Sequence, residues 1–583
     1  MKPFNKNIGK DSEANLKAEH ITADILIIGA GGAGLRAAIA AQERGADVII
    51  VSKSLLGKAH TVMAEGGIAA SLGDVDSKDN WEVHFSDIIA EGVYLSNWRM
   101  AEILAREAPG RVYELEHYGA LFDRTSEGRI MQRAFGGHTY RRLCHVGDKT
   151  GLEMLRVLQS RVLHRQIRIM DETVVTRLFK AKGRICGAFT VRLRSGTLAV
   201  IEANAVIVAT GGCGRLYMVT SNSWESTGDG AGLAYGAGAE LMDMEMIQFH
   251  PTGMVYPPGA KGLLVTEGVR GEGGILLNSR GERFMERYSP TRKELDARDV
   301  VARAIYAEIE AGNGTEHGGV YLDISFKGRN FILKKLPGMY SQFMDFAGID
   351  ITKERMEVAP TVHYQMGGIR VDAESTATCI PGLYAAGEAC AGLHGANRLG
   401  GNSLADILVF GKRSGENAAK YALGKRHNAI PEHEVHMESK RIASYLGRGT
   451  NPYVIAEKLR ETMSTHAGII RDGKELAEAL GIVKRLKGDA KRMAVGGGLK
   501  YNKGLVECFA VNSMLLSAEA ILRSALMRKE SRGAHTRKDF PKKSPEWRRN
   551  IICRYSSGKM ELSTADVPAL PKRLAHLVKK EAY

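Results

Sequence analysis

A short glycine pattern near the N-terminus constrains the fold of this chain more than any other feature. Gly29, Gly31 and Gly34 form a GxGxxG motif within ADILIIGAGGAGLRAAIAAQERGADVIIVSK, after an apolar run and before a helical pattern. The first glycine permits a tight turn, the second admits a pyrophosphate, and the third lets helix and strand pack closely. The helix N-terminus adds positive potential. The stretch therefore predicts a buried strand, a glycine turn, a helix and a second strand that bind a dinucleotide.

The end of the second predicted strand indicates which dinucleotide is bound. In NAD-binding proteins an acidic residue usually binds the ribose there, but this strand ends in Ser52 and Lys53. A further apolar strand, AVIVATGG at residues 205–212, is followed by STGDG, which contains Asp229. This pair is similar to flavoprotein strands whose acid reaches the cofactor. FAD is therefore favoured over NAD.

Composition narrows the class of protein. A chain of 583 residues is too long for one hydrophobic core, and 44% apolar with 25% charged residues is typical of a soluble globular protein. The net charge of +15 is compatible with nucleic acid, an anionic membrane or an anionic small molecule as partner. The seven cysteines include no CxxC pair, which argues against a zinc site or an iron–sulfur cluster in this chain. The polar N-terminal residues 1–20 contain no apolar signal core, so we expect a cytosolic chain.

Several polar residues stand beside glycines in the middle of the chain. They lie in QFHPTG (His250), LLVTEGVRGEGG (Thr266, Glu267, Arg270), LDARDVVAR (Arg298, Asp299), PTVHYQMGG (His363) and HGANRLGGNSL (His394, Arg398). A small dicarboxylate suits such a set, because arginine binds one carboxylate with a two-donor fork while histidine or threonine holds the other. Arginine is a poor general base at its usual pKa, above about 12. Arg298 would therefore need an acidic neighbour such as Glu267 or Asp299 to move a proton.

The loop LLGKAHTVMAEGG, residues 55–67, raises a separate question. His60 stands at its mouth, and Gly66 and Gly67 at its end allow a close approach of backbone to a ligand. From the residues alone, His60 is a packed side chain, a metal ligand, a catalytic base or an attachment point for a cofactor. These four roles stay open at this level.

In their order and combination, the motifs resemble those of the flavoprotein subunit of succinate dehydrogenase and fumarate reductase. The likeness covers nearly the whole chain. The matching stretches are GxGxxG, AHTVMAEGG, QRAFGGHT, QFHPTG, TEGVRGEGG, GERFMERY, HGANRLGGNSL and SRGAHTRKDFP. This resemblance implies an oxidoreductase that interconverts succinate and fumarate.

The resemblance also implies roles for individual residues. His60 matches the histidine that bonds covalently to FAD, and Arg298 matches the arginine that shuttles the proton, with His250 and Glu267 beside it. The implied dicarboxylate ligands are Phe135, His250, Thr266, His363 and Arg398. The expected FAD contacts are Gly29, Gly31, Gly34, Ser52, Lys53, His60, Thr61, Ala64, Glu65, Gly66, Gly67, Asp229, Glu388, Ser403 and Leu404. No metal site is expected.

The predicted fold class is α/β, a Rossmann-like FAD-binding domain interrupted by an α+β capping domain and followed by a helical domain and a short C-terminal domain. We predict the FAD-binding domain at 1–249 and 363–420, the capping domain at 250–362, the helical domain at 421–530 and a basic C-terminal region at 531–583. That last region is either a solvated extension or a docking surface. The expected partners are an iron–sulfur subunit, membrane anchor subunits reached through it and a small dicarboxylate, but no nucleic acid. We expect a peripheral protein on the cytoplasmic side of the cell membrane.

Two other activities compete with this interpretation. GGHTYRRLCHVGDKTG is similar to the corresponding stretch of L-aspartate oxidases, although those enzymes typically lack a histidine at the His60 position. A basic flavoprotein that acts on nucleic acid would suit the net charge but would leave the dicarboxylate set unexplained. The direction of the reaction also stays open. Glu65 resembles fumarate reductases, in which glutamate is common at this position, whereas dehydrogenases commonly have glutamine.

Overall fold

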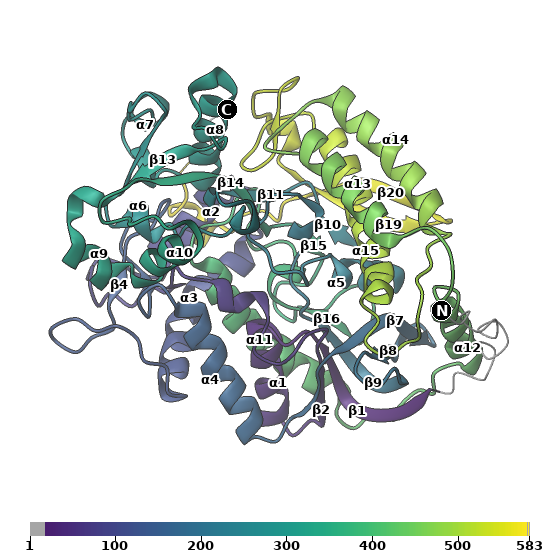
Figure 1. The fold of residues 1–583 in the computed structure, drawn as a ribbon. Helices are drawn as coiled ribbons and strands as arrows, with labels where there is room; N and C mark the ends of the chain where they lie inside the picture. Colours follow the sequence, from purple (N-terminus) through teal and green to yellow (C-terminus); the bar gives the residue numbers. More distant parts are fainter. Residues whose placement is uncertain (1–17, 580, 582–583) are drawn as a thin grey trace, which may run out of the picture.

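A seven-stranded sheet forms the base of the molecule, as seen in a computed structural model that describes residues 18–579 and 581 (Figure 1). The strand order is β6-β2-β1-β9-β8-β7, and β16 pairs with β9. The strands are β1 (Glu19–Ile28), β2 (Val48–Val51), β6 (Arg168–Met170), β7 (Thr173–Ala181), β8 (Arg184–Arg192), β9 (Leu198–Val208) and β16 (Leu383–Ala385). The prediction about the N-terminal signal core falls mostly on residues 1–17, outside the described residues.

The predicted strand–turn–helix–strand unit is present. β1 leads through the glycine turn into α1 (Gly32–Glu43) and then into β2, which pairs with β1 in parallel. The inner positions of β1 are buried and apolar, as expected for a parallel strand covered on both faces. Helix α11 (Asn402–Ala422) packs against α1, and a Cβ on Gly415 would overlap the carbonyl oxygen of Ala37. The glycine therefore permits the close helix contact.

The chain leaves this sheet after β9 and returns to it at β16. Between them a second sheet has the order β11-β14-β13-β12. Its strands are β11 (Ile247–Met254), β12 (Ile275–Leu277), β13 (Val320–Asp323) and β14 (Met356–Gln365), and the helices of the segment are α6 (Gly268–Gly271), α7 (Met285–Tyr288), α8 (Arg298–Glu308), α9 (Arg329–Lys335) and α10 (Pro337–Ala347). This segment, teal in Figure 1, has a hydrophobic core of its own. The predicted limits at 250 and 362 lie inside β11 and β14, so continuous strands join the segment to the rest.

Helices dominate the rest of the chain. They include α2 (Trp81–Glu91), α3 (Trp98–His117), α4 (Thr150–His164), α5 (Asp229–Gly236), α12 (Glu432–Ala443), α13 (Pro452–His466), α14 (Gly473–Ala490) and α15 (Lys503–Met527). Helix α15 alone among the described residues is long and apolar enough to cross a membrane by length and composition, but 72% of its most apolar window is buried in the protein. It packs against α5, α13 and α14. Within this fold α15 is a core helix.

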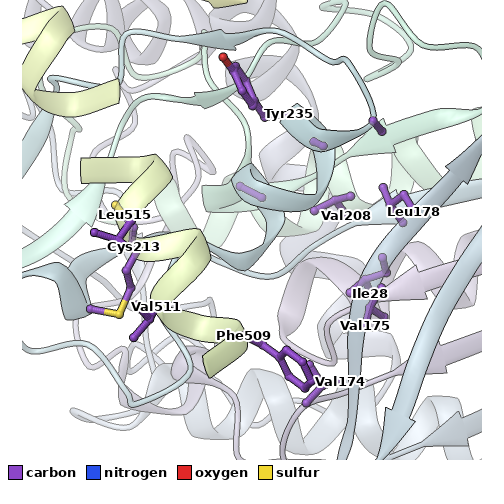
Figure 2. Close-up of a cluster of buried hydrophobic side chains, with 14 of the residues drawn as sticks. Ile28, Val174, Val175, Leu178, Val208, Cys213, Tyr235, Phe509, Val511 and Leu515 are labelled. Carbon is purple, nitrogen blue, oxygen red and sulfur yellow. The ribbon is translucent and has the colours of Figure 1, made fainter. Parts of the chain in front are cut away.

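Figure 2 shows how α15 joins the first sheet. Phe509, Val511 and Leu515 of α15 lie in the same buried cluster as Ile28 at the end of β1 and Val208 at the end of β9. The helical segment and the sheet therefore share one hydrophobic core. Burial of these apolar side chains fixes α15 beside the strand ends.

Strand pairing attaches the basic C-terminal region to the body of the protein, so it is not a detached extension, although many of its side chains from residue 538 to 579 are exposed. β19 (Arg549–Ser556) and β20 (Lys559–Asp566) form a hairpin, and β19 pairs with β10 (Leu241–Met242), which in turn pairs with β15 (Gly368–Ile369). Arg528 is fully buried and donates to Glu245 at 2.6 Å and Glu530 at 3.2 Å. A buried charge needs such partners, and here the distant Glu245 and the nearby Glu530 supply them. The remaining short elements are β3 (Ile68–Ala69), β4 (Gln132–Arg133), β5 (Leu143–Cys144), β17 (Ile470–Arg471), β18 (Thr536–Arg537) and α16 (Lys572–Ala575).

Candidate functional site

The glycine turn between β1 and α1 is built by close backbone contacts. Gly29 has φ of +112°, and a Cβ there would overlap the carbonyl oxygen of Ala209. A Cβ on Gly34 would likewise overlap the carbonyl oxygen of Gly29. The first and third glycines are therefore required by the turn itself. The amide of Gly32 donates to the hydroxyl of Thr61 at 3.1 Å, which ties the loop after β2 to the start of α1.

A cavity lies at the carboxyl ends of β1, β2, β9 and β16, the edge at which open α/β sheets bind their ligands. Twelve of the residues that the sequence singles out line it. They are Gly29, Gly31, Ser52, Lys53, His60, Thr61, Ala64, Asp229, His363, Glu388, Ser403 and Leu404. Lys53 donates to Asp229 at 2.7 Å, so the residue at the end of β2 meets an acid supplied by α5.

Four predicted cofactor contacts do not line this cavity. Gly34 packs in the turn, and Gly66 lies under the ring of Phe135, where a Cβ would stand 2.5 Å from Cζ. Gly67 has φ of +130° and lies against the backbone of Cys144. The fourth residue, Glu65, lies beside Arg133, whose Nη2 donates to the Glu65 carbonyl at 3.3 Å. These residues shape the wall behind the cavity.

Several unpredicted polar residues also line the cavity. Thr210, Ser223 and Glu225 each place buried side-chain oxygens there with no hydrogen-bond partner among residues 18–579 and 581. Buried polar atoms without partners are costly, so these oxygens are fitted to the hydroxyl and amide groups of a polar ligand. An extended FAD, with polar groups along its length, fits this lining. Only Thr210, which ends the strand pattern AVIVATGG, carried a signal in the sequence.

His60 lies at the start of a short 3₁₀ turn, His60–Met63, and lines the same cavity. Desolvation lowers the pKa of His60 to about 4, although the charge of Glu225 opposes the shift. The imidazole is therefore neutral at neutral pH. Nδ1 accepts a hydrogen bond from the amide of Ser223 at 3.3 Å. A neutral, oriented imidazole is suited to nucleophilic attachment.

A second cluster lies where the inserted segment meets the first sheet. Antiparallel pairing of β11 with β14 places the rings of His250 and His363 5.1 Å apart. Arg298, the first residue of α8, donates from Nε to Oε2 of Glu267 at 2.8 Å. Its Nη1 donates to Gln248 of β11 at 3.3 Å. Side chains that lie more than a hundred positions apart in the sequence thus form one polar cluster.

The charges in this cluster are coupled. Desolvation and then the charge of Arg298 hold the pKa of His250 well below its usual value, so the imidazole is neutral. Burial would raise the pKa of Glu267, but Arg298 and Arg270 outweigh it and leave the pKa below normal. Desolvation and Arg298 lower the pKa of Arg398 to about 9. The cluster therefore holds one ionised carboxylate among several arginines.

Unused hydrogen-bond donors mark this cluster as an anion site. Nε of Arg398 and both Nε and Nη2 of Arg270 are buried without a hydrogen-bond partner in the described part of the chain. Nδ1 of His250 is also unpartnered, but it is an acceptor, because the imidazole is neutral and its Nε2 donates towards the carbonyl of Val265 at 3.2 Å. A small anion that accepts from the arginine nitrogens would satisfy them. Arg398 also donates to Ser403 at 3.0 Å and stacks on Tyr364 at 4.6 Å, which holds its side chain in place. The lining of the cofactor cavity also includes Ser403 and Tyr364, so the two sites adjoin.

The remaining predicted residues have more specific places. Phe135 is buried against Gly66 and Gly400, and a Cβ on Gly400 would stand 3.3 Å from Nη2 of Arg298. Thr266 is buried, and its hydroxyl accepts from the amide of Gly268 at 3.2 Å. His394, in contrast, bonds the hydroxyl of Tyr364 at 3.1 Å, the residue on whose ring Arg398 stacks. Among residues 18–579 and 581, no three His, Cys, Asp or Glu side chains group as metal ligands do.

Comparison with known protein families gives two matches. A family described as FAD binding domain matches residues 24–404. A second, described as fumarate reductase flavoprotein C-term, matches residues 456–576. Together these matches cover most of the chain, including both polar clusters.

Individual relatives match over nearly their whole length. A fumarate reductase (CoM/CoB) chain from Methanothermobacter marburgensis is 48% identical over 542 residues, 92% of this chain and 98% of the relative. The succinate dehydrogenase flavoprotein subunit of Rickettsia conorii is 38% identical over 559 residues, 91% of this chain and 93% of the relative. Among solved structures, Mycobacterium smegmatis Sdh1 in complex with UQ1 has a TM-score of 0.86 at 49% identity, covering 95% of this chain and 96% of that one.

Proposed function

The chain belongs to the family of succinate dehydrogenase and fumarate reductase flavoprotein subunits, FAD-dependent oxidoreductases, and we propose that it converts succinate to fumarate or the reverse with FAD held covalently through His60. The observation that carries the proposal is the adjacency of two sites. A dinucleotide cavity and an arginine–histidine cluster with unused donors share Tyr364 and Ser403.

Different residues of the cavity would contact different parts of FAD. Gly29 and Gly31 would admit the pyrophosphate at the N-terminus of α1, and Asp229 with Lys53 would hold the adenosine end. Glu388, Ser403 and Leu404 would contact the flavin end, where the neutral His60 would form the covalent bond. Bound FAD supplies the acceptor or donor of a hydride. The chain's own residues then bind and orient the dicarboxylate and move the proton.

The dicarboxylate would lie among the arginines and histidines. Arg398 would bind one carboxylate with its free Nε, while His250, Thr266 and His363 would hold the other. Phe135 would cover the carbon chain and exclude water. A twist of one carboxylate out of conjugation would polarise the neighbouring carbon–carbon bond.

Arg298 is the group that would hold and move the proton. Its Nε–H points to the carboxylate of Glu267 at 2.8 Å, so a proton taken from the substrate carbon can pass on to Glu267. The low pKa of Glu267 means that the carboxylate is ionised and able to accept. In this proposal Glu267 is the positioned group to which Arg298 would pass the proton.

The partners follow from the same proposal. Electrons would leave the flavin for a separate iron–sulfur subunit, consistent with relatives that are themselves named as subunits. Membrane anchor subunits would bind through that partner, which would place the chain peripherally on the cytoplasmic side. Co-purification of the chain with an iron–sulfur protein would support this assembly.

The direction of the reaction is the finer question. Fumarate reduction is supported by the buried carboxyl of Glu65 behind the cofactor wall and by the name of the Methanothermobacter relative. A covalent flavin bond, which raises the potential, would favour succinate oxidation instead.

The function is tested by assaying the purified, flavin-loaded protein in both directions. We expect succinate to reduce an artificial dye and fumarate to reoxidise a reduced dye. L-aspartate is the control substrate. Oxidation of L-aspartate with no turnover of succinate would overturn the proposal in favour of an L-aspartate oxidase.

A further inference from the structure

The motif SRGAHTRKDFP has no part in the chemistry above, yet part of it lies behind both arginines of the site. Residues 532–536, here called the bracket loop, follow α15 and lead into β18. The loop contacts α8, which begins with Arg298, and the turn 396–398, which ends with Arg398. These two segments come from different parts of the fold, the inserted segment and the first sheet. The bracket loop is a third segment that bonds both.

The contact with α8 is made by Arg303. Its Nη1 donates to the carbonyl of Gly533 at 3.0 Å and approaches the hydroxyl of Thr536 at 3.5 Å. The same nitrogen pairs with Asp299 at 2.8 Å, one turn earlier in the helix. Asp299 directly follows Arg298. The bracket loop is therefore linked, through one arginine, to the first turn of the helix that carries Arg298.

The contact of the bracket loop with the turn 396–398 completes a ring of hydrogen bonds. The amide of Ala534 donates to the carbonyl of Ala396 at 2.9 Å. Asn397, the next residue, donates from Nδ2 to Oδ1 of Asp299 at 3.0 Å. Arg398 follows Asn397 directly. Bracket loop, turn and α8 thus form a closed ring of hydrogen bonds that passes within one residue of each arginine.

The bracket loop is rigid enough to serve as a support. Arg532 is buried and donates to Glu530 at 2.7 Å and to the carbonyl of Val93 at 2.8 Å. His535 is also buried and bonds Arg471 at 3.0 Å. Gly533 has φ of +54°, and a Cβ there would stand 2.6 Å from the carbonyl oxygen of Ala396. The glycine lets the loop lie directly on the turn.

We propose that Arg303 is a positioning residue that, through the bracket loop and Asp299, sets the separation of Arg298 from Arg398. The reaction needs both arginines at fixed places on one small molecule, and they repel each other because both are cationic and buried. A closed ring resists that repulsion better than either segment alone. This inference rests on the roles of Arg298 and Arg398 in the proposed function. A role limited to the pairing of Asp299 and Arg303 within the helix would not require the bond to Gly533.

The test compares Arg303→Met, Arg303→Lys and wild type as flavin-loaded protein. Arg303→Met removes the ring bonds while keeping an unbranched apolar stem in place of the arginine methylenes. A misplacement of a catalytic group by about 1 Å can cost as much as about 100-fold in rate, so we expect kcat for succinate oxidation to fall at least about tenfold. Arg303→Lys keeps one donor and should restore most of the rate. The binding of malonate, read from the flavin absorption spectrum, should weaken in the Met variant in parallel.

The matched control is Arg287→Met. Arg287 pairs at 2.7 Å with Glu308, which is the last residue of α8, and makes no bond to the ring. The Arg287→Met variant should lose about as much folding stability as Arg303→Met, while its kcat and its malonate binding stay within about twofold of wild type. If Arg303→Met behaves like Arg287→Met in both kinetics and malonate binding, the proposal is overturned.

A second variant keeps the proposal testable if Arg303→Met folds poorly. Gly533→Ala should push the bracket loop from the turn and lower kcat without removing any charge. In the double variant Arg303→Met with Gly533→Ala, the losses should be less than additive, because one break already opens the ring. Additive losses would contradict a shared ring. A wild-type protein that does not turn over succinate would count against the proposed function itself, which separates the two failures.

Discussion

Arg298 donates from Nε to Oε2 of Glu267 at 2.8 Å, and both side chains are shielded from solvent. The pair joins the first residue of α8 to the residue just before α6, and it is a buried ion pair of the candidate site. Because Glu267 is held ionised by its arginine neighbours, it can accept a proton that Arg298 carries. Proton transfer should therefore depend on this pair.

Replacement of Arg298 by Lys should abolish the proton transfer while leaving the cofactor bound. Lysine keeps the charge but cannot reach both substrate and Glu267 with a planar fork, so we expect kcat to fall by about 10²–10⁴-fold. Turnover of succinate and flavin content should be measured on the same preparation. Arg283→Lys is the control, since Arg283 pairs with Glu294 at 2.6 Å elsewhere in the inserted segment. Near-normal turnover of Arg298→Lys would remove Arg298 from the proton path.

The covalent tether is tested directly by denaturation. Wild-type protein precipitated in acid should retain its yellow flavin on the polypeptide, and His60→Ser should release it into the supernatant. The reason is that the neutral imidazole of His60 lines the cofactor cavity. His433→Ser, a change at an exposed histidine, should retain the flavin as wild type does. Extractable FAD in the wild type would refute the tether.

Glu388 predicts a pH dependence of stability. Desolvation raises its pKa from 4.5 to about 7. The folded state therefore binds more protons than the unfolded state between these values, and stability is lost as the pH rises from 4.5 towards 7. The loss attributable to Glu388 is at most about 3 kcal/mol, from 1.36 kcal/mol per unit of pKa.

Replacement of Glu388 by Gln should remove this loss. The free energy of unfolding, measured in urea from pH 4.5 to 7.5 on protein without flavin, should decline less steeply in Glu388→Gln than in wild type. Parallel curves for the two proteins would show that Glu388 does not titrate in this range. Glu432→Gln, at an exposed acid at the start of α12, serves as the control and should leave the curve unchanged.

Glu65 predicts how the potential of the flavin responds to pH. Burial, followed by the charge of Asp148, raises the pKa of Glu65 well above its usual value. Below that pKa the carboxyl is neutral, so wild type and Glu65→Gln should have the same midpoint potential. Above it the new negative charge should stabilise the oxidised flavin and lower the wild-type potential. Fumarate reduction would then be favoured at higher pH.

The size of this effect follows from one charge in a partly polar medium. Two unit charges about 12 Å apart at an effective dielectric constant of about 20 interact by on the order of 1 kcal/mol, or about 20 mV for a two-electron couple, and we expect an effect of this order. Potentiometric titration of both proteins across the pH range would measure it. Identical curves at every pH would exclude Glu65 from control of the direction.

Local patterns were sufficient for the strands β1 and β2 around the glycine turn and for the end of β9, but not for β6, β7 and β8 of the same sheet. The glycine turn was predictable from its local pattern, and at Gly34 the constraint is itself local, because a Cβ there would overlap the carbonyl oxygen of Gly29. The close approach of Gly29 to Ala209 of a distant segment was not visible in the pattern. The apolar runs of β1 and β9 likewise predicted strands, since parallel strands are buried on both faces and are therefore apolar throughout. Asp229 could be associated with the cofactor through its motif, but its bond to Lys53 could not.

The sequence by itself determined the dinucleotide turn, the strand–helix alternation around it and, through its motifs, the family. The tertiary structure alone decided which charges meet. Arg528 is buried because Glu245, 283 positions away, comes to it, and the bracket loop reaches Arg303 across 230 positions. Nothing in a local pattern distinguishes a solvated arginine from one that meets a distant carboxylate. That distinction depends on the desolvation of the arginine and on its pairing with a carboxylate, and both arise only when the chain has folded.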